Sequence, residues 1–239
     1  GAFCDAASAA SPVGMAVVTA LYEMKPALPV GPGAGLVTGA ATNVGGNLNV
    51  INLDPKSNGI TINAGSVVNL DGSTSVVTLP GTPPRASVLD NDPSLRDLTN
   101  ADVSGEKFFK SFMGEGFTEY QNNSKTHLIT SGSCSGLLRC TSCASANACG
   151  QAISDAYTAG AEKFWADTDV SMRNANKPAA TATNPDRTFG TATRPLVVAS
   201  SAHIEMSGSI VAYGLFYAAT SSATADLVDP GTGTATVFG

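Results

Sequence analysis

This 239-residue chain has little charge of either sign and few aromatic side chains. Charged residues make up only 13% of it, against about 25% in an average globular protein, and aromatic residues make up 6%. With a formal net charge of −6, the chain lacks the generally basic surface that binding to nucleic acid or to anionic membranes requires. We therefore expect no nucleic-acid partner.

The sequence also contains no run of 18 consecutive apolar residues, which a transmembrane helix would need. Residues 11–25 have the amphipathic pattern of a shorter helix, which we expect to pack on the core. The sequence has no phosphate-binding loop, no dinucleotide-binding glycine motif, no zinc-protease motif and no nucleophile elbow. We therefore expect no enzyme, and we assign no catalytic, cofactor-binding or metal-binding residue.

Two stretches rich in Gly, Asn, Thr and Val occupy residues 34–80 and 194–239. In both, small or apolar residues alternate with polar ones, and Gly or Asn interrupts the pattern roughly every 8–12 residues, as in short strands joined by turns. We predict one mainly β domain over residues 1–239, a right-handed β-helix or solenoid-like scaffold that both stretches share, because neither is long enough to bury a core alone. A β-sandwich with a helical subdomain is the alternative. Residues 174–194, rich in Ala, Thr and Pro, are predicted to be a linker before the second stretch.

The middle of the chain has a helical pattern instead. Phenylalanines between residues 108 and 117 recur at roughly helical spacing, and residues 147–169 are predicted to form the strongest helix, with Phe164 and Trp165 on its apolar face. We predict that a helical, cysteine-bearing insert of about residues 90–170 docks on the side of the β-scaffold.

Four cysteines lie close together in the pattern C-x5-C-x2-C-x5-C, at Cys134, Cys140, Cys143 and Cys149, and Cys4 stands apart. Two disulfides, a four-cysteine zinc site and free thiols are the possible states. Zinc sites of this class usually place CxxC pairs far apart in the sequence, so we favour two disulfides, with three pairings open. Disulfides indicate an oxidising compartment such as the periplasm or the cell exterior.

The two histidines give weak signals of chemistry. His203 and Glu205 are predicted to lie on one face of a strand, where they could form a proton relay. The sequence offers them no nucleophile motif and no third metal ligand nearby. We expect a surface or cross-strand pair, and we expect His127 to be an ordinary strand residue.

The aspartates suggest two further hypotheses. Asp90, Asp92 and neighbouring oxygens could bind calcium, but they lack the spacing of a calcium loop, and Asp92 before Pro93 has the pattern of a helix N-cap. Asp167 and Asp169 are expected to be solvated residues after a helix end. The alternative function is a secreted carbohydrate-active β-helix that uses these four carboxylates, which requires two carboxyl groups about 5–9 Å apart.

One aromatic cluster could bind a ligand. Strand alternation places Tyr213 and Tyr217 on one face and Phe216 on the other. If exposed, the two tyrosines could stack on sugar rings in a carbohydrate-binding or adhesin module, although such aromatics more often belong to a core. Exposure of the two rings distinguishes these possibilities.

Several motifs of the chain occur together in one known family. They are VGGNLNV, SNGITINAG, LPGTPPRASVLDND, GEKFFKSFMG, the cysteine cluster SGSCSGLLRCTSCASANACG, FWADTDVSM and RPLVVASSAHIEMSGSIVAYGLFYAAT. In this order they resemble the soluble region of PilX-type pilus-assembly proteins, the minor-pilin-like components of type IV pili in Gram-negative bacteria. The resemblance covers about residues 34–239, and the last motif and the cysteine cluster are its most specific parts.

The resemblance implies a non-catalytic structural protein at the cell surface. Such a protein primes pilus assembly or helps adhesion at the tip, passes through the periplasm, and has other pilin subunits as partners. The family also implies an N-terminal hydrophobic helix, missing from this sequence, as the only membrane contact, and a chain that continues beyond Gly239. It supplies no catalytic residues to transfer.

Overall fold

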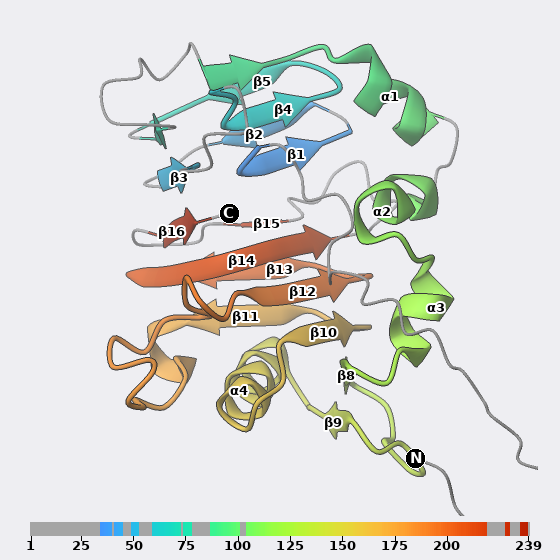
Figure 1. The fold of residues 1–239 in the computed structure, drawn as a ribbon, viewed down its shortest axis with the longest axis vertical. Helices are drawn as coiled ribbons and strands as arrows, with labels where there is room; N and C mark the ends of the chain where they lie inside the picture. Colours follow the sequence, from blue (N-terminus) through green and yellow to red (C-terminus); the bar gives the residue numbers. More distant parts are fainter. Residues whose placement is uncertain are drawn as a thin grey trace, which may run out of the picture.

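The computed structural model of the chain describes residues 34–39, 41–44, 49–52, 59–72, 74–77, 87–100, 104–218, 228–229 and 235–238. In this part, parallel β-strands dominate and the helices are concentrated in the middle of the chain (Figure 1). The helix predicted at 11–25 and Cys4 lie outside the described residues.

The first Gly- and Asn-rich stretch forms short strands at a constant spacing. The strands are β1 (Leu36–Thr38), β2 (Thr42–Val44), β3 (Asn49–Ile51), β4 (Ile62–Ala64), β5 (Val68–Leu70), β6 (Ser75–Val77) and, just after the stretch, β7 (Val88–Leu89). Each pairs in parallel with a strand 26 residues away, as in the partners Leu36 and Ile62, Ile62 and Val88, Thr42 and Val68, and Asn49 and Ser75. Gly59 and Gly72, two of the residues that interrupt the alternating pattern, lie in turns and have the positive φ that a side chain would disfavour.

In the described residues, local sequence signals account for four α-helices and one named 3-10 helix. They are α1 (Pro93–Asn100), α2 (Glu106–Met113), α3 (Phe117–Asn122), α4 (Ala146–Thr158) and η3 (Asn174–Asn176). The Asp92 carboxylate accepts a hydrogen bond from the Ser94 amide at 2.9 Å and so caps α1 as predicted. Ser145 caps α4 by accepting from the Ala148 amide. Within the described residues, no helix is long and apolar enough to cross a membrane.

The rest of the chain adds further strands to the same stack, most of them longer than those of the first stretch. They are β8 (Thr126–Thr130), β9 (Cys140–Ser142), β10 (Lys163–Ala166), β11 (Val170–Arg173), β12 (Leu196–Ser200), β13 (Ile204–Ser207), β14 (Ile210–Ala218), β15 (Val228–Asp229) and β16 (Ala235–Phe238). The largest sheet has eight strands in the order β6-β3-β16-β14-β12-β10-β8-β9, and the smaller sheets are β1-β4-β7, β11-β13-β15 and β2-β5. Every named strand pair in the described ranges is parallel, so the β-sandwich alternative, which is built from antiparallel sheets, does not fit.

The two ends of the chain meet in the middle of this stack. Strand β16 pairs with β14 on one side and with β3 on the other, which places Phe238 next to Ile51. Figure 1 shows the blue strands of the first stretch continuing the stack beyond the red strands of the last. Both stretches therefore contribute to one sheet.

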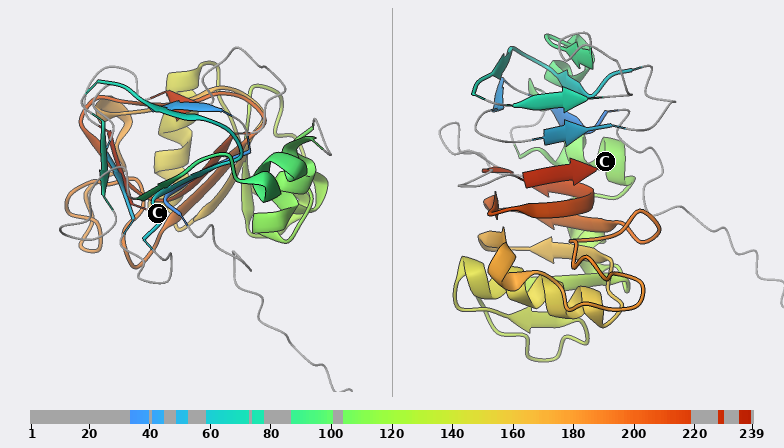
Figure 2. Two further views of the ribbon diagram at one scale, coloured as in Figure 1. Left: turned by 90° about the horizontal axis from the view of Figure 1, so that it is seen from above. Right: turned by 90° about the vertical axis from the view of Figure 1, so that its left-hand side faces the viewer.

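Alternate residues of the central strands enter two different apolar clusters. Phe164, Leu196 and Val198 face the inner cluster, into which α4 also packs. Trp165 and Val197, the intervening residues, face an outer cluster formed with the aromatic residues of α2 and α3. Seen from above in Figure 2, these green helices lie against one outer side of the stacked strands.

Three expectations for the middle of the chain are corrected. The helix predicted over 147–169 ends at Thr158, and Phe164 and Trp165 belong to β10. Gly160 has a φ of 109°, which stops the helix, and β10 then pairs with β8 and β12 on its two edges.

The insert of residues 90–170 is also less separate than predicted, because β8, β9 and β10 are members of the eight-stranded sheet. The segment 174–194 is not a free linker. Asn184 and Phe189 are buried, since this segment folds back onto the sheet, where Phe189 pairs with Ala212.

Candidate functional site

The clustered cysteines form two disulfides between successive members of the cluster. Cys134 pairs with Cys140 and Cys143 with Cys149, with Cα–Cα distances of 5.5 and 5.1 Å. This pairing selects one of the three that the sequence leaves open. It also uses all four thiols, so the zinc site is not formed.

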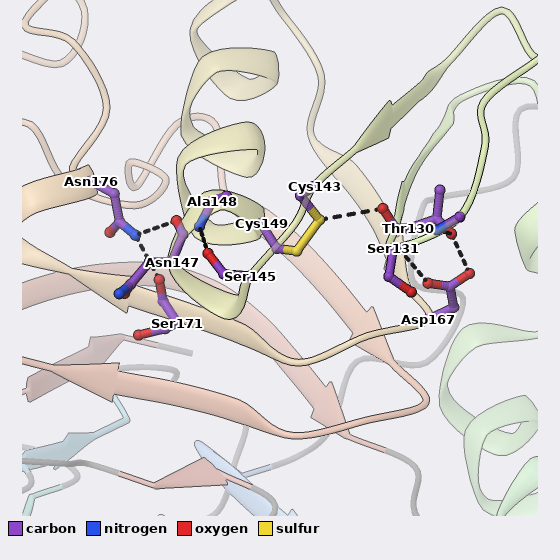
Figure 3. The surroundings of a disulfide bond; sticks show 11 residues. Thr130, Ser131, Cys143, Ser145, Asn147, Ala148, Cys149, Asp167, Ser171 and Asn176 are labelled. Carbon is purple, nitrogen blue, oxygen red and sulfur yellow. Dashed lines mark hydrogen bonds between the residues drawn. A yellow bond between two sulfur atoms is a disulfide. The ribbon is translucent and has the colours of Figure 1, made fainter.

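The Cys143–Cys149 disulfide fastens the N-terminus of α4 to the sheet. Cys149 is completely buried, and the amide of Cys143 donates to the carbonyl of Thr130 in β8 at 2.9 Å. On the other side of the same helix end, the Asn176 amide group donates to the carbonyls of Ser171 and Asn147 (Figure 3). The first turn of α4 is thus held by a covalent bond and by buried hydrogen bonds.

The Cys134–Cys140 disulfide closes an exposed loop, residues 134–140, at the end of the stack. Its second cysteine begins β9, the terminal strand of the eight-stranded sheet. Within the loop, Leu137 is 52% exposed and Leu138 is fully exposed. Moving an apolar side chain of this size out of water lowers the free energy. The loop therefore holds two adjacent leucines in solvent on a covalently closed turn, which favours a contact surface.

Tyr213 and Tyr217, the two tyrosines for which a core position was favoured over ligand stacking, have different surroundings. Tyr217 packs against Phe109, with ring centroids 4.9 Å apart, and its hydroxyl donates to the Gly105 carbonyl at 3.0 Å. It fastens α2 to β14. Tyr213 instead stacks on Phe238, with ring centroids 4.6 Å apart and an angle of 11° between the rings, and it borders a pocket.

The pocket beside Tyr213 has a volume of about 180 Å³. Its other walls come from residues 183–186, Thr188 and residues 191–192. Two turns of the same design form these walls. Thr181 and Asn184 in one turn, and Thr191 and Arg194 in the other, exchange two backbone hydrogen bonds. In each turn the threonine hydroxyl also accepts a hydrogen bond from the backbone amide of the partner residue. The sequence signal of these two turns is the repeated Thr-Ala-Thr at 181–183 and 191–193, which the linker prediction did not use.

A buried amide holds the pocket in shape. The Asn184 side chain accepts from the Thr188 amide at 2.9 Å and donates to the Thr188 carbonyl at 2.8 Å. Arg187 has a left-handed φ of 55°, which is uncommon for a residue with a side chain. Its guanidinium donates to the carbonyls of Pro178 and Lys177. These bonds fix the turn that presents Asp186.

The predicted His203–Glu205 pair does not form. Glu205 pairs with Arg173 at 2.6 Å and accepts from the Ser171 hydroxyl at 2.8 Å. Burial acts to raise the pKa of Glu205, but hydrogen bonds from Arg173, Ser171 and Ser207 outweigh it and lower the pKa below its ordinary value. His203 precedes β13 and uses its backbone amide, which donates to Asp169 at 3.2 Å.

The remaining histidine is a strand residue. His127 lies in β8, and its Nε2 atom is 2.9 Å from the Thr141 hydroxyl of the adjacent strand β9. Burial, with a smaller contribution from the charge of Arg139, lowers the pKa of His127. Its contacts are those of a cross-strand hydrogen bond.

The four candidate aspartates do not assemble into one site. Asp92 caps α1 and accepts from the Asn63 amide group at 3.2 Å, and hydrogen bonds, first of all from the Ser94 hydroxyl, lower its pKa. Asp167 accepts from the Thr130 hydroxyl at 2.6 Å and follows β10, a strand and not the predicted helix. Helix α1 and strand β10 lie in opposite halves of the stack (Figure 1).

A calcium site at Asp90 and Asp92 receives no support from the geometry. Across the described ranges, no group of three or more His, Cys, Asp or Glu side chains lies close enough to hold a metal ion. No family model, curated protein or solved structure matches this chain. The features of the chain that bear on function are the loop at 134–140, the pocket beside Tyr213 and the parallel architecture.

Proposed function

We propose that this chain is a non-catalytic surface structural protein, a minor-pilin-like subunit of type IV pilus assembly or of the pilus tip. The observation that supports this most directly is the 134–140 loop, in which a disulfide presents Leu137 and Leu138 to solvent at the end of a stack of strands. A preorganised apolar turn loses little conformational freedom when it binds a partner. The motif resemblance to PilX-type proteins names the partner: another pilin subunit.

We also propose that the parallel strands form one right-handed β-helix. The support is the equal spacing of partners in different sheets. Trp165 pairs with Ala199 and Val170 pairs with Ile204, so both β10 and β11 find their partners 34 residues later. In a β-helix the chain completes one full turn between paired strands, so the sequence separation between partners is the same in each sheet. Parallel crossovers are right-handed in about 98% of cases, so we propose a right-handed helix.

Such an architecture suits a subunit that works outside the cytoplasm. Consecutive turns hydrogen-bond along the stack, and two disulfides secure the end at which the 134–140 loop lies. Disulfides persist in oxidising compartments, which supports a location in the periplasm during assembly and at the cell surface afterwards.

The carbohydrate-active enzyme is the weaker alternative. Hydrolysis of a glycoside needs two carboxyl groups facing one substrate bond. Asp92 is engaged in capping α1, and Asp167 holds the end of β8 to the end of β10. Their roles in the scaffold account for both without a substrate.

Cross-linking in a piliated cell that produces this protein tests the proposal. A photo-reactive amino acid at Leu138 is expected to cross-link the protein to another pilin, whereas the same amino acid at Val67, which is 47% exposed on the first stretch, serves as the matched control. The double variant Leu137→Ser/Leu138→Ser should reduce co-purification of that pilin and keep the melting temperature of the wild type, because both side chains are already in solvent.

Two results together would refute the assembly role: no pilin among the cross-linked products at Leu138, and unchanged piliation when the gene is deleted. Cross-linking at Val67 but not at Leu138 would place the contact on the first stretch and would contradict the role of the loop.

A further inference from the structure

We propose that the pocket beside Tyr213 binds one ring of a neutral sugar. This binding site is separate from the 134–140 loop and does not depend on the pilin assignment. The proposal rests on an aromatic platform, on the polar groups around it, and on the charge and size of the pocket.

The aromatic platform is the ring of Tyr213. Phe238 covers one face of this ring at a centroid distance of 4.6 Å and holds its orientation, so a ligand must use the other face. The amide of Tyr213 donates to the carbonyl of Phe189 at 2.8 Å, which makes Gly190 the neighbour of Tyr213 in the adjacent segment. Gly190 has a φ of 83°, and a Cβ atom there would lie 2.1 Å from the Tyr213 carbonyl oxygen. The neighbouring position therefore has no side chain to cover the ring.

The polar groups around the platform are hydroxyls and one carboxylate. Thr183, Asp186 and Thr191 line the pocket, and the first two are exposed. Threonine hydroxyls can both donate and accept, and a carboxylate accepts strong hydrogen bonds from hydroxyl groups. A pyranose ring has matching chemistry, since its C–H groups stack on an aromatic face and its hydroxyls lie around its edge.

Charge selects neutral sugars over anionic ones. Among the described residues that line the pocket, none is Lys, Arg or His, and Asp186 supplies a negative charge. The nearest guanidinium in the sequence, Arg187, donates to two backbone carbonyls, and the Lys177 ammonium group donates to the Ser209 carbonyl. A phosphate or carboxylate on the ligand would find repulsion and no partner.

Size limits the ligand to one bound ring. The volume of about 180 Å³ is below the ~300 Å³ at which sites for drug-sized molecules begin. A larger glycan would extend from the open pocket into solvent. The expected affinity for a single ring is correspondingly weak, with a Kd on the order of 1 mM.

Titration of the ¹⁵N-labelled protein with cellobiose, maltose, lactose and chitobiose, followed by NMR, tests the proposal. At least one of these neutral disaccharides is expected to shift the amide signals of Thr183, Asp186, Thr191 and Tyr213. Tyr213→Leu should weaken that binding about tenfold through loss of the aromatic face, and Asp186→Asn should weaken it several-fold. Asp97→Asn, an exposed change on α1 outside the pocket, is the matched control and should bind as the wild type does.

Three results would each overturn the proposal. The first is that none of the four disaccharides shifts these amide signals. The second is binding that survives Asp186→Asn and Tyr213→Leu unchanged; the exposed Asp186 keeps this comparison valid even if Tyr213→Leu loses its native spectrum. The third is tighter binding of glucuronic acid than of glucose, which would show that the pocket selects anions.

Discussion

Replacement of Gly150 by alanine tests how closely α4 packs on β11. Alanine normally stabilises a helix by about 1 kcal/mol relative to glycine. Here the added Cβ would lie 1.9 Å from the Ser171 carbonyl oxygen and 2.6 Å from the amide nitrogen of Asn176, and Asn176 itself donates to that carbonyl at 2.6 Å. Ser171 lies in β11, whose backbone is held by its pairing with β13, so the helix must shift and the buried hydrogen bond is lost.

The substitution has two costs, the overpacking of the contact between α4 and β11 and the loss of the hydrogen bond from Asn176 to Ser171. Overpacking of a tight contact costs about 1–3 kcal/mol, and a buried polar group left without its partner costs about 1–3 kcal/mol. After the gain in helix propensity is subtracted, we expect Gly150→Ala to lower the free energy of unfolding by about 1–5 kcal/mol.

Urea unfolding of the oxidised protein, followed by the fluorescence of Trp165, the single tryptophan, measures this change. The control is Gln151→Ala, at the next position of α4, where the side chain bonds only to the exposed Asp155 and the expected change is below about 0.5 kcal/mol. A Gly150→Ala protein as stable as the wild type, or more stable, would refute the close packing of α4 on β11.

Three further predictions follow from individual contacts. Each disulfide closes a short loop with a sequence separation of 6, which contributes about 2 kcal/mol of chain entropy to stability. Because Cys149 is buried, we expect Cys143→Ser/Cys149→Ser to destabilise the protein more than Cys134→Ser/Cys140→Ser in the same urea assay. Equal losses of stability in the two variants would contradict this. Since the folded protein lowers the pKa of Glu205 from 4.5, its stabilisation is present above that value and disappears as the pH falls through the lower folded-state pKa; Glu205→Gln should therefore flatten the acid side of the stability curve, and an unchanged curve would rule out the role of Glu205. Arg194 lies over the Tyr157 ring at 4.0 Å and pairs with Glu162 at 2.9 Å, so Arg194→Lys should cost about 1 kcal/mol in thermal unfolding, whereas Arg139→Lys, on the exposed 134–140 loop, should cost almost nothing.

The short strands of the first stretch could be predicted because their signals are local. Val50 and Ile62 lie in alternating segments, and Gly59 and Gly72 mark the turns between strands. The cap at Asp92 was predictable for the same reason. Signals of this kind depend on a few neighbouring residues, so they persist whatever the rest of the chain does.

The error at Phe164 and Trp165 has a physical origin. The spacing from Ile153 to these two residues fits a helical face. The segment Lys163–Ala166, however, has only four residues, too few to distinguish a helix from a strand by periodicity. Strand β10 obtains its stability from two neighbours, β8 and β12, which are distant in sequence. Gly160, with its positive φ, is the local signal that ends the helix.

The candidate sites were predictable only in part. The cysteine cluster identified the two disulfides but not their pairing, and alternation identified Tyr213 without its pocket. The pocket exists because the segment 181–194 folds back beside β14, where Phe189 pairs with Ala212. This contact between segments is invisible to any pattern within either one.

The way in which the two stretches join has a consequence for folding. The inner residues of the first stretch form a small cluster around Val50, Ile62 and Val76, and one edge of β3 is completed only by β16. The side chains of Asn49 and Thr236, which bond across this pair, are separated by 187 residues. Contacts of such long range are slow to form because a large loop must close first. The first stretch therefore cannot complete its sheet until the last strand has been made.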